Sequence, residues 1–199
     1  NLDEKKCVAF ATNANDALFV SKDVARILLA KVYMYQQKWA AASNLLQQVV
    51  DKNIYSMEKV PTKYTSENKD LILALKLLGI ESRASRVNVD GSPEEVVPIM
   101  TSTDVKLLYA ECEIHLGNNA KASKYISEVG NINGISGTNV SVEGIKQLRK
   151  SLKLQDYFAF LKRNGLAIKE LGLEKYQLLL PIPQNEINMN PNMTQNPGY

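Results

Sequence analysis

Histidine and cysteine, which often bind metals or take part in nucleophilic catalysis, are scarce in this chain. His115 is the single histidine among 199 residues, so a site with several histidine ligands is excluded. The two cysteines, Cys7 and Cys112, are too few and too far apart for a metal knuckle or a disulfide framework. Cys112 occupies a small apolar position in a predicted helix, which favours a buried thiol. The sequence predicts no metal site and no cofactor.

Long apolar runs and strong charge are absent as well. No stretch approaches the roughly 18 apolar residues of a membrane-spanning helix. The formal net charge is +3, and Lys and Arg are spread along the chain, so no nucleic-acid-binding surface is indicated. The first residues, Asn1–Lys6, are polar and lack the apolar core of a signal peptide. We therefore expect any targeting segment to have been removed, unless the protein is cytosolic.

Paired carboxylates suited to acid–base catalysis are also missing. Glu111 and Glu113 lie two positions apart in a predicted helix, and residues at that spacing point in different directions. No nucleophile motif lies near His115, which we expect to be a solvated or hydrogen-bonded helix residue. The sequence therefore predicts a protein that is not an enzyme.

The chain does contain an internal repeat of two helix pairs, 21–50 and 102–129. In both, apolar residues recur three and four positions apart, which indicates amphipathic helices. A break near Gln37–Lys38 divides the first pair, and Gly117 suits the turn of the second. Four pairs of equivalent residues are each eighty positions apart: Ala30 and Ala110, Ala42 and Ala122, Leu46 and Ile126, Val49 and Val129. The pattern resembles the tetratricopeptide repeat, a helix–turn–helix unit of about 34 residues.

Two further regions complete the predicted domain, which we place over 1–199. A third helical region, 142–171, is expected to pack beside the second pair, because a repeat needs neighbours to bury its apolar face. The insertion 51–101 breaks the period. It contains the run LILALKLLG (71–79), which suits a short helix or a strand, and Asp90–Gly91, which is typical of a tight turn between strands.

The C-terminal residues carry the most specific motif. Residues 178–199 read LLLPIPQNEINMNPNMTQNPGY. This segment resembles the terminal signature of the SusD/RagB family, in which leucines precede PIPQxEI and NPNxxQNPGY. Residues 97–111 are similar to the family's strand-to-helix stretch DVxLxYAE, with Thr101 and Ser102 where the family usually has Arg and Tyr. In this chain we expect those two residues and Asp104 to cap the helix.

The tail is also informative physically. Its four prolines exclude a continuous helix, so we expect an extended tail, 176–199, packed on the helices through its leucines and isoleucines. Asn and Gln side chains should bond the backbone groups that such a path leaves unpaired. The fold class is therefore all-α, with tetratricopeptide-like antiparallel helix pairs, a short irregular or hairpin insertion, and this tail.

The family resemblance implies a function. It predicts a surface-exposed, lipid-anchored outer-membrane protein, with signal peptide and anchor outside this sequence, that works with a TonB-dependent transporter of the SusC type. The ligand would be an oligosaccharide, or else a peptide. The chain is shorter than full-length family members, which indicates a short or truncated member. The alternative is a helical-repeat scaffold that binds only protein and has lost the ligand site.

Ligand-binding candidates lie in the insertion, where relatives hold their ligand. Aromatic faces stack on sugar C–H groups, while amide and guanidinium groups bond hydroxyls. The residues of these types are Tyr64, Asn68, Arg83, Arg86 and Asn88. Trp39 could also stack on a sugar, but at its repeat position we expect it to pack between helices. Tyr55 is expected to be structural.

Overall fold

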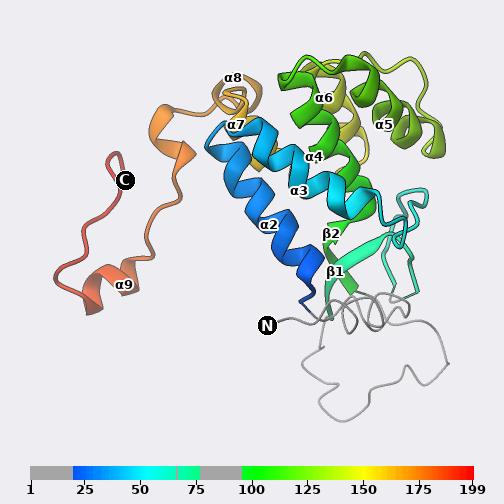
Figure 1. The fold of residues 1–199 in the computed structure, drawn as a ribbon. Coiled ribbons are helices and arrows are strands. Elements are labelled where there is room, and N and C mark those ends of the chain that lie inside the picture. Colours follow the sequence, from blue (N-terminus) through cyan, green and yellow to red (C-terminus); the bar gives the residue numbers. More distant parts are fainter. Residues whose placement is uncertain (1–19, 66, 77–95) are drawn as a thin grey trace, which may run out of the picture. The chain divides into compact units, whose positions relative to one another are not determined.

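The computed structural model describes residues 20–65, 67–76 and 96–199 (Figure 1). The chain divides into two compact units, Asn1–Gln155 and Asp156–Tyr199. The described elements of the first unit are α2 (Lys22–Tyr35), α3 (Trp39–Val50), β1 (Leu71–Lys76), β2 (Val96–Thr101), α4 (Ser102–His115), α5 (Asn119–Ile132) and α6 (Val142–Ser151). No described helix is both long and apolar enough to cross a bilayer.

The two predicted helix pairs are present, and their turns are equivalent in detail. α2 packs against α3, and α4 packs against α5. Gln37 and Gly117, eighty positions apart, both have positive φ, at 58° and 80°. The N–H of Lys38 donates to the carbonyl of Tyr33 at 2.8 Å, and the equivalent bond from Asn118 is also 2.8 Å. Each pair therefore turns through the same hydrogen-bonded loop, and the predicted repeat is confirmed.

The pairs stack directly, although the insertion separates them in sequence. α3 packs against α4 (Figure 1). The Ser43 hydroxyl donates to the Glu113 carboxylate, which also accepts from the Asn118 amide at 2.9 Å. At the end of this interface Trp39 stacks on His115, with ring centroids 3.8 Å apart and planes within 8°. Trp39 thus packs between helices, as predicted.

Three buried residues of α4 have exposed equivalents on α2. Leu108, Tyr109 and Cys112 are at most 3% exposed. The residues eighty positions earlier, Leu28, Leu29 and Val32, are 50%, 42% and 49% exposed. Leu28 lies outside the buried apolar stripe of α2, which runs through Val24, Ile27, Ala30 and Met34. The described residues of the first unit leave its face uncovered.

A side-chain cap begins the first helix of each pair. The Ser21 hydroxyl accepts from the N–H of Val24 at 3.2 Å and begins α2. The Thr101 hydroxyl accepts from the N–H of Asp104 at 3.1 Å and begins α4. The Tyr55 hydroxyl donates to Asp23 at 3.3 Å, which agrees with the structural role expected for Tyr55.

The insertion contributes a two-stranded antiparallel sheet. β1 pairs with β2 in a register that runs from Leu71 opposite Thr101 to Lys76 opposite Val96, with two irregularities near Leu73. The run at 71–76 is therefore a strand. The predicted turn at Asp90–Gly91 lies outside the described residues. Because β2 ends at Thr101 and α4 begins at Ser102, the sheet leads directly into the second helix pair.

The third helical region is broken into short helices. In the first unit, α6 contacts α4 and α5, which gives the second pair its predicted neighbour. In the second unit lie α7 (Tyr157–Arg163), α8 (Ala167–Leu171), the 3-10 helix η2 (Lys175–Leu178) and α9 (Gln184–Met189). A buried ion pair links Arg163 to Asp156 at 2.9 Å within this unit.

The tail is held by side-chain amides, as predicted. The Gln195 amide accepts from the N–H of Ile182 at 2.8 Å and donates to its carbonyl at 2.9 Å. Asn196 donates to the carbonyl of Leu180, and the Tyr199 hydroxyl donates to that of Leu179 at 2.8 Å. These bonds close the tail into a loop within the second unit. Its packing on the helix pairs stays a prediction.

Candidate functional site

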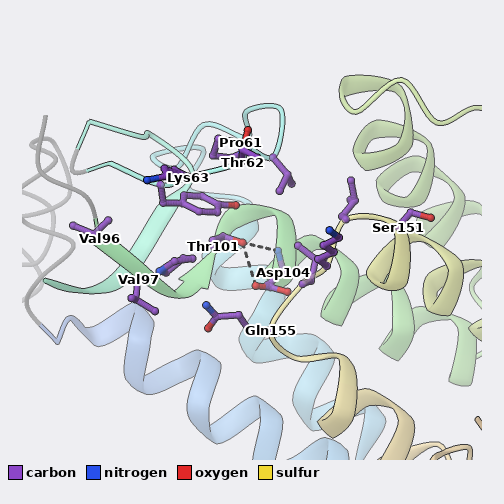
Figure 2. Close-up of a pocket in the computed structure, with 15 residues that line it drawn as sticks. Pro61, Thr62, Lys63, Val96, Val97, Thr101, Asp104, Ser151 and Gln155 are labelled. Carbon is purple, nitrogen blue, oxygen red and sulfur yellow. Dashed lines mark hydrogen bonds between the residues drawn. The ribbon is translucent and has the colours of Figure 1, made fainter. Parts of the chain in front are cut away.

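A pocket of about 570 Å³ lies in the first unit, where three segments distant in sequence meet (Figure 2). We name it the Tyr64 pocket. Its walls are the loop after α3, the strand β2 with the start of α4, and the turn after α6. The lining residues are Val60, Pro61, Thr62, Lys63, Tyr64, Val96, Val97, Pro98, Thr101, Asp104, Ser151, Leu152, Lys153, Leu154 and Gln155.

The loop wall is fixed at both ends. The N–H of Val60 donates to the Asn133 side chain, at the end of α5, at 2.8 Å. The carbonyl of Tyr64 accepts from the N–H of Val96 at 3.0 Å. The Tyr64 side chain packs against the buried cluster of Leu71, Ala74 and Val96. A side chain held in this way loses little further freedom when a ligand binds, which favours affinity.

The Tyr64 hydroxyl is a dependable hydrogen-bond donor. Burial raises its pKa, and the nearby charges of Asp70, Asp104 and Glu58 raise it further. The phenol therefore stays protonated at every physiological pH, since its ordinary pKa is already 10.0. The residue combines one aromatic face with one polar group, which suits a ligand with both C–H and hydroxyl surfaces.

Asp104 lines the pocket, but its carboxylate is already engaged. Arg149 donates to it at 3.1 Å. The Thr101 hydroxyl, which caps the helix, lies 3.2 Å from the other oxygen of Asp104 (Figure 2). Arg149 is fully buried, at 0% exposed, and Asp104 is 8% exposed. This ion pair ties α6 to the start of α4, so it holds two pocket walls together.

A second buried carboxylate, Asp70, lies at the same helix start. It accepts from the N–H of Thr103 at 3.0 Å and from the Thr103 hydroxyl. Burial raises the pKa of Asp70, to about 7. The hydrogen bonds from Thr103 lower this pKa, and the charges of Asp104 and Glu58 raise it further. Asp70 is not among the pocket residues, but it fixes the strand-to-helix junction that forms one wall.

The elevated pKa of Asp70 predicts a pH-dependent stability. Between pH 4 and 7 the folded state keeps a proton that the unfolded chain releases, because the unfolded pKa is near 3.8. The free energy of unfolding should therefore fall as pH rises, by on the order of 2 kcal/mol between pH 5 and 8. Urea unfolding at the two values measures it.

The Asp70→Asn variant is the control, because its amide oxygen still accepts from Thr103 and does not titrate. It should remove most of this difference between pH 5 and 8. An Asp70→Asn protein whose stability falls with pH as steeply as the wild type would contradict the assignment.

The structure separates the predicted ligand residues. Tyr64 lines the pocket. Asn68 does not: its amide donates to Glu58 at 3.2 Å and accepts from the N–H of Thr65 at 2.8 Å, which shapes the loop. The predicted residues Arg83, Arg86 and Asn88 lie outside the described residues.

Metal binding and catalysis by His115 or Cys112 have no support among the residues that the structure describes. No group of three His, Cys, Asp or Glu residues there could hold a metal ion. His115 is exposed and stacked on Trp39. Cys112 is a fully buried free thiol of α4, as predicted.

The third wall of the Tyr64 pocket was not predicted from the sequence. Ser151–Gln155 lies about ninety positions after Tyr64, in a turn that the sequence analysis placed inside a helical region. The positive φ of Lys153, 52°, ends α6 there. No glycine marks this turn, so its signal in the sequence is weak.

Comparisons with known proteins show what this chain is similar to. The model of the SusD family matches residues 148–199. A SusD superfamily protein from Bacteroides thetaiotaomicron has a similar structure, with a TM-score of 0.68 at 16% identity over 90% of this chain and 61% of that protein. A protein described as sugar binding from Bacteroides vulgatus gives 0.65 at 19% identity, over 92% and 61%.

A third structure, surface glycan-binding protein A from Bacteroides thetaiotaomicron, gives a TM-score of 0.65 at 15% identity, over 90% of this chain and 64% of that one. The chain thus spans less than two thirds of these proteins. No curated protein matches it by sequence. The resemblance to the SusD/RagB family is confirmed by the family segment together with the fold.

Proposed function

We propose that this chain is a non-catalytic saccharide-binding protein of the cell surface and that its ligand occupies the Tyr64 pocket. The observation that carries the proposal is the pocket itself, in a chain with the SusD-family fold and segment. Its volume of about 570 Å³ lies within the roughly 300–1,000 Å³ of small-molecule sites. A peptide is the alternative ligand for the same pocket.

The lining suits a sugar. Tyr64, Pro61 and Pro98 offer apolar surface to ring C–H groups. Thr62 of the loop wall and Ser151 and Gln155 of the turn wall can bond sugar hydroxyls as donors or acceptors. Two of the similar structures are described as sugar binding and glycan binding, which agrees with this chemistry.

The family resemblance supplies the wider setting of the proposal. A SusD-like protein would sit on the outer membrane by a lipid anchor and pass its ligand to a TonB-dependent transporter of the SusC type. The test is genetic context followed by co-purification: an adjacent gene for such a transporter, and its recovery with this protein from membranes. Recovery of no transporter from the native host would contradict the partnership while leaving ligand binding open.

Replacement of Tyr64 tests the pocket. Tyr64→Ala should weaken binding of any saccharide returned by a screen about two- to twelve-fold, since a stacked aromatic contributes roughly 0.5–1.5 kcal/mol beyond burial. Titration calorimetry measures the affinity, and circular dichroism checks that the variant is folded. Trp39→Ala is the matched aromatic control: it should lower stability through lost helix packing and leave affinity unchanged. Loss of binding in a folded Trp39→Ala protein would place the ligand elsewhere.

One observation favours the scaffold reading as a second function. Leu28, Leu29 and Val32 of α2 are partly exposed, whereas the equivalent residues of α4 are buried. An exposed apolar face of this kind can receive a helix from a protein partner. A broad screen of saccharides and peptides distinguishes the two functions, because a scaffold would bind no member of it.

A further inference from the structure

The Asn133 side chain joins the end of α5 to the loop wall of the Tyr64 pocket. Asn133 directly follows α5, and its amide nitrogen donates to the carbonyl of Val129 at 2.9 Å. Its amide oxygen accepts from the N–H of Val60 at 2.8 Å, across 73 positions of sequence. Val60 begins the loop wall, whereas Asn133 itself does not line the pocket. One side chain therefore both ends a helix and holds a wall of the site.

The turn that carries Asn133 is tightly built. The N–H of Ile135 donates to the carbonyl of Gly130 at 2.8 Å, and the N–H of Gly134 donates to that of Asn131 at 3.1 Å. This pair of bonds is the Schellman arrangement at a helix end. A Cβ on residue 130 would lie only 2.5 Å from the carbonyl oxygen of Ile135, so the close approach requires glycine. The turn thus fixes the point from which the Asn133 amide reaches Val60.

A second helix end shows what such an asparagine does as a cap. Asn164 directly follows α7 and donates to the carbonyl of Phe160 at 3.0 Å, the same four-position bond that Asn133 makes. Gly165 follows it with φ at 69°, as Gly134 follows Asn133 with φ at 74°. Asn164 belongs to the second unit and does not line the pocket. The cap uses the amide nitrogen, so the oxygen of Asn133 is the atom that serves the pocket.

We infer that Asn133 is a positioning residue for the saccharide site. Through the N–H of Val60 it holds the loop wall, which also contains Tyr64, in the place that the ligand needs. The inference rests on the proposed saccharide-binding function. A wall that is held before binding has little freedom left to lose, whereas a released wall must be ordered by the ligand at a cost in affinity.

Two variants separate positioning from capping. Asn133→Asp keeps an oxygen that accepts from Val60 but loses the donor to Val129, and Asn133→Ala loses both. Asn133→Ala should therefore weaken ligand binding about two- to twelve-fold, the effect of one hydrogen bond. Asn133→Asp should bind like the wild type, although both variants lower the melting temperature. Asn164→Ala is the matched control: it removes a cap of the same form and should leave affinity unchanged.

The probe is a pool of oligosaccharides from hydrolysed neutral and acidic polysaccharides, added to the intact protein. Its half-saturating concentration is read from slowed amide exchange in 96–104 and 151–155, the two walls that Asn133 does not hold. In the protein without ligand, the Val60 amide should exchange faster in Asn133→Ala and at the wild-type rate in Asn133→Asp. A capping role alone would not distinguish the two variants in this way.

The outcomes separate this inference from the proposed function. Equal half-saturating concentrations for the wild type and Asn133→Ala would overturn the inference and leave the proposed function standing. Equal weakening in Asn133→Asp and Asn133→Ala would also overturn it, because the bond to Val60 would then not be the cause. No protection of the wild type by the pool would overturn both.

Discussion

Arg149→Met should lower the free energy of unfolding by about 3–5 kcal/mol, because it leaves the buried carboxylate of Asp104 without its cation. Arg149 is fully buried and bonds Asp104, which is 8% exposed, at 3.1 Å, so little water reaches the carboxylate to replace the lost partner. The pair also joins the α6 wall of the pocket to the α4 wall. Urea unfolding measures the loss.

A matched exposed pair provides the control. Lys106 pairs with Glu128, whose side chain is 40% exposed. Glu128→Gln should therefore cost no more than about 1 kcal/mol. The double variant Asp104→Asn/Arg149→Met should recover part of the loss of Arg149→Met, since it removes both charges of this pair. Similar losses in Arg149→Met and Glu128→Gln would show that burial does not set the strength of the first pair.

The second large effect comes from the repeat. Leu108→Ala should cost about 2–5 kcal/mol, since Leu108 is a fully buried residue of α4. Leu28→Ala makes the same chemical change at the equivalent position, eighty residues earlier, where the side chain is 50% exposed. It should cost less than about 1 kcal/mol.

The comparison of these two leucines is informative in either direction. Both variants are measured by chemical unfolding under one condition, and the difference between them is the quantity of interest. A loss in Leu28→Ala as large as in Leu108→Ala would mean that the outer face of α2 is covered in solution. The first helix pair would then have a neighbour other than the described residues of the first unit.

The helix pairs could be predicted from the sequence because their information is local and repeated. Ala30 and Ala110, or Ala42 and Ala122, need only a period of eighty to be recognised, and all four are fully buried. The caps at Ser21 and Thr101 follow from side-chain chemistry at helix starts. The break at Gln37 was also evident, because its equivalent is Gly117.

Burial on individual helix faces could not be predicted in the same way. Leu28 and Leu108 have the same residue type and the same position in the repeat, yet only Leu108 has a neighbouring helix to cover it. Periodicity shows which residues share a face. It does not show which face receives a partner, because that depends on tertiary contacts.

The pocket was predictable only in part, for a similar reason. Tyr64 was found from its residue type and its place in the insertion. Lys153 and Asp104 reach the same pocket through contacts that are remote in sequence, such as the bond between Arg149 and Asp104 across 45 positions. Asn68 has the residue type of a sugar ligand but serves its own loop.

Amide hydrogen exchange tests ligand binding at the Tyr64 pocket most directly. The intact protein is measured with and without a pool of oligosaccharides from hydrolysed neutral and acidic polysaccharides. Exchange should slow in 60–64, 96–104 and 151–155, the three walls, and stay unchanged around Trp39 and His115. Unchanged exchange in all three walls, or protection confined to the Trp39–His115 stack, would contradict a saccharide site in this pocket.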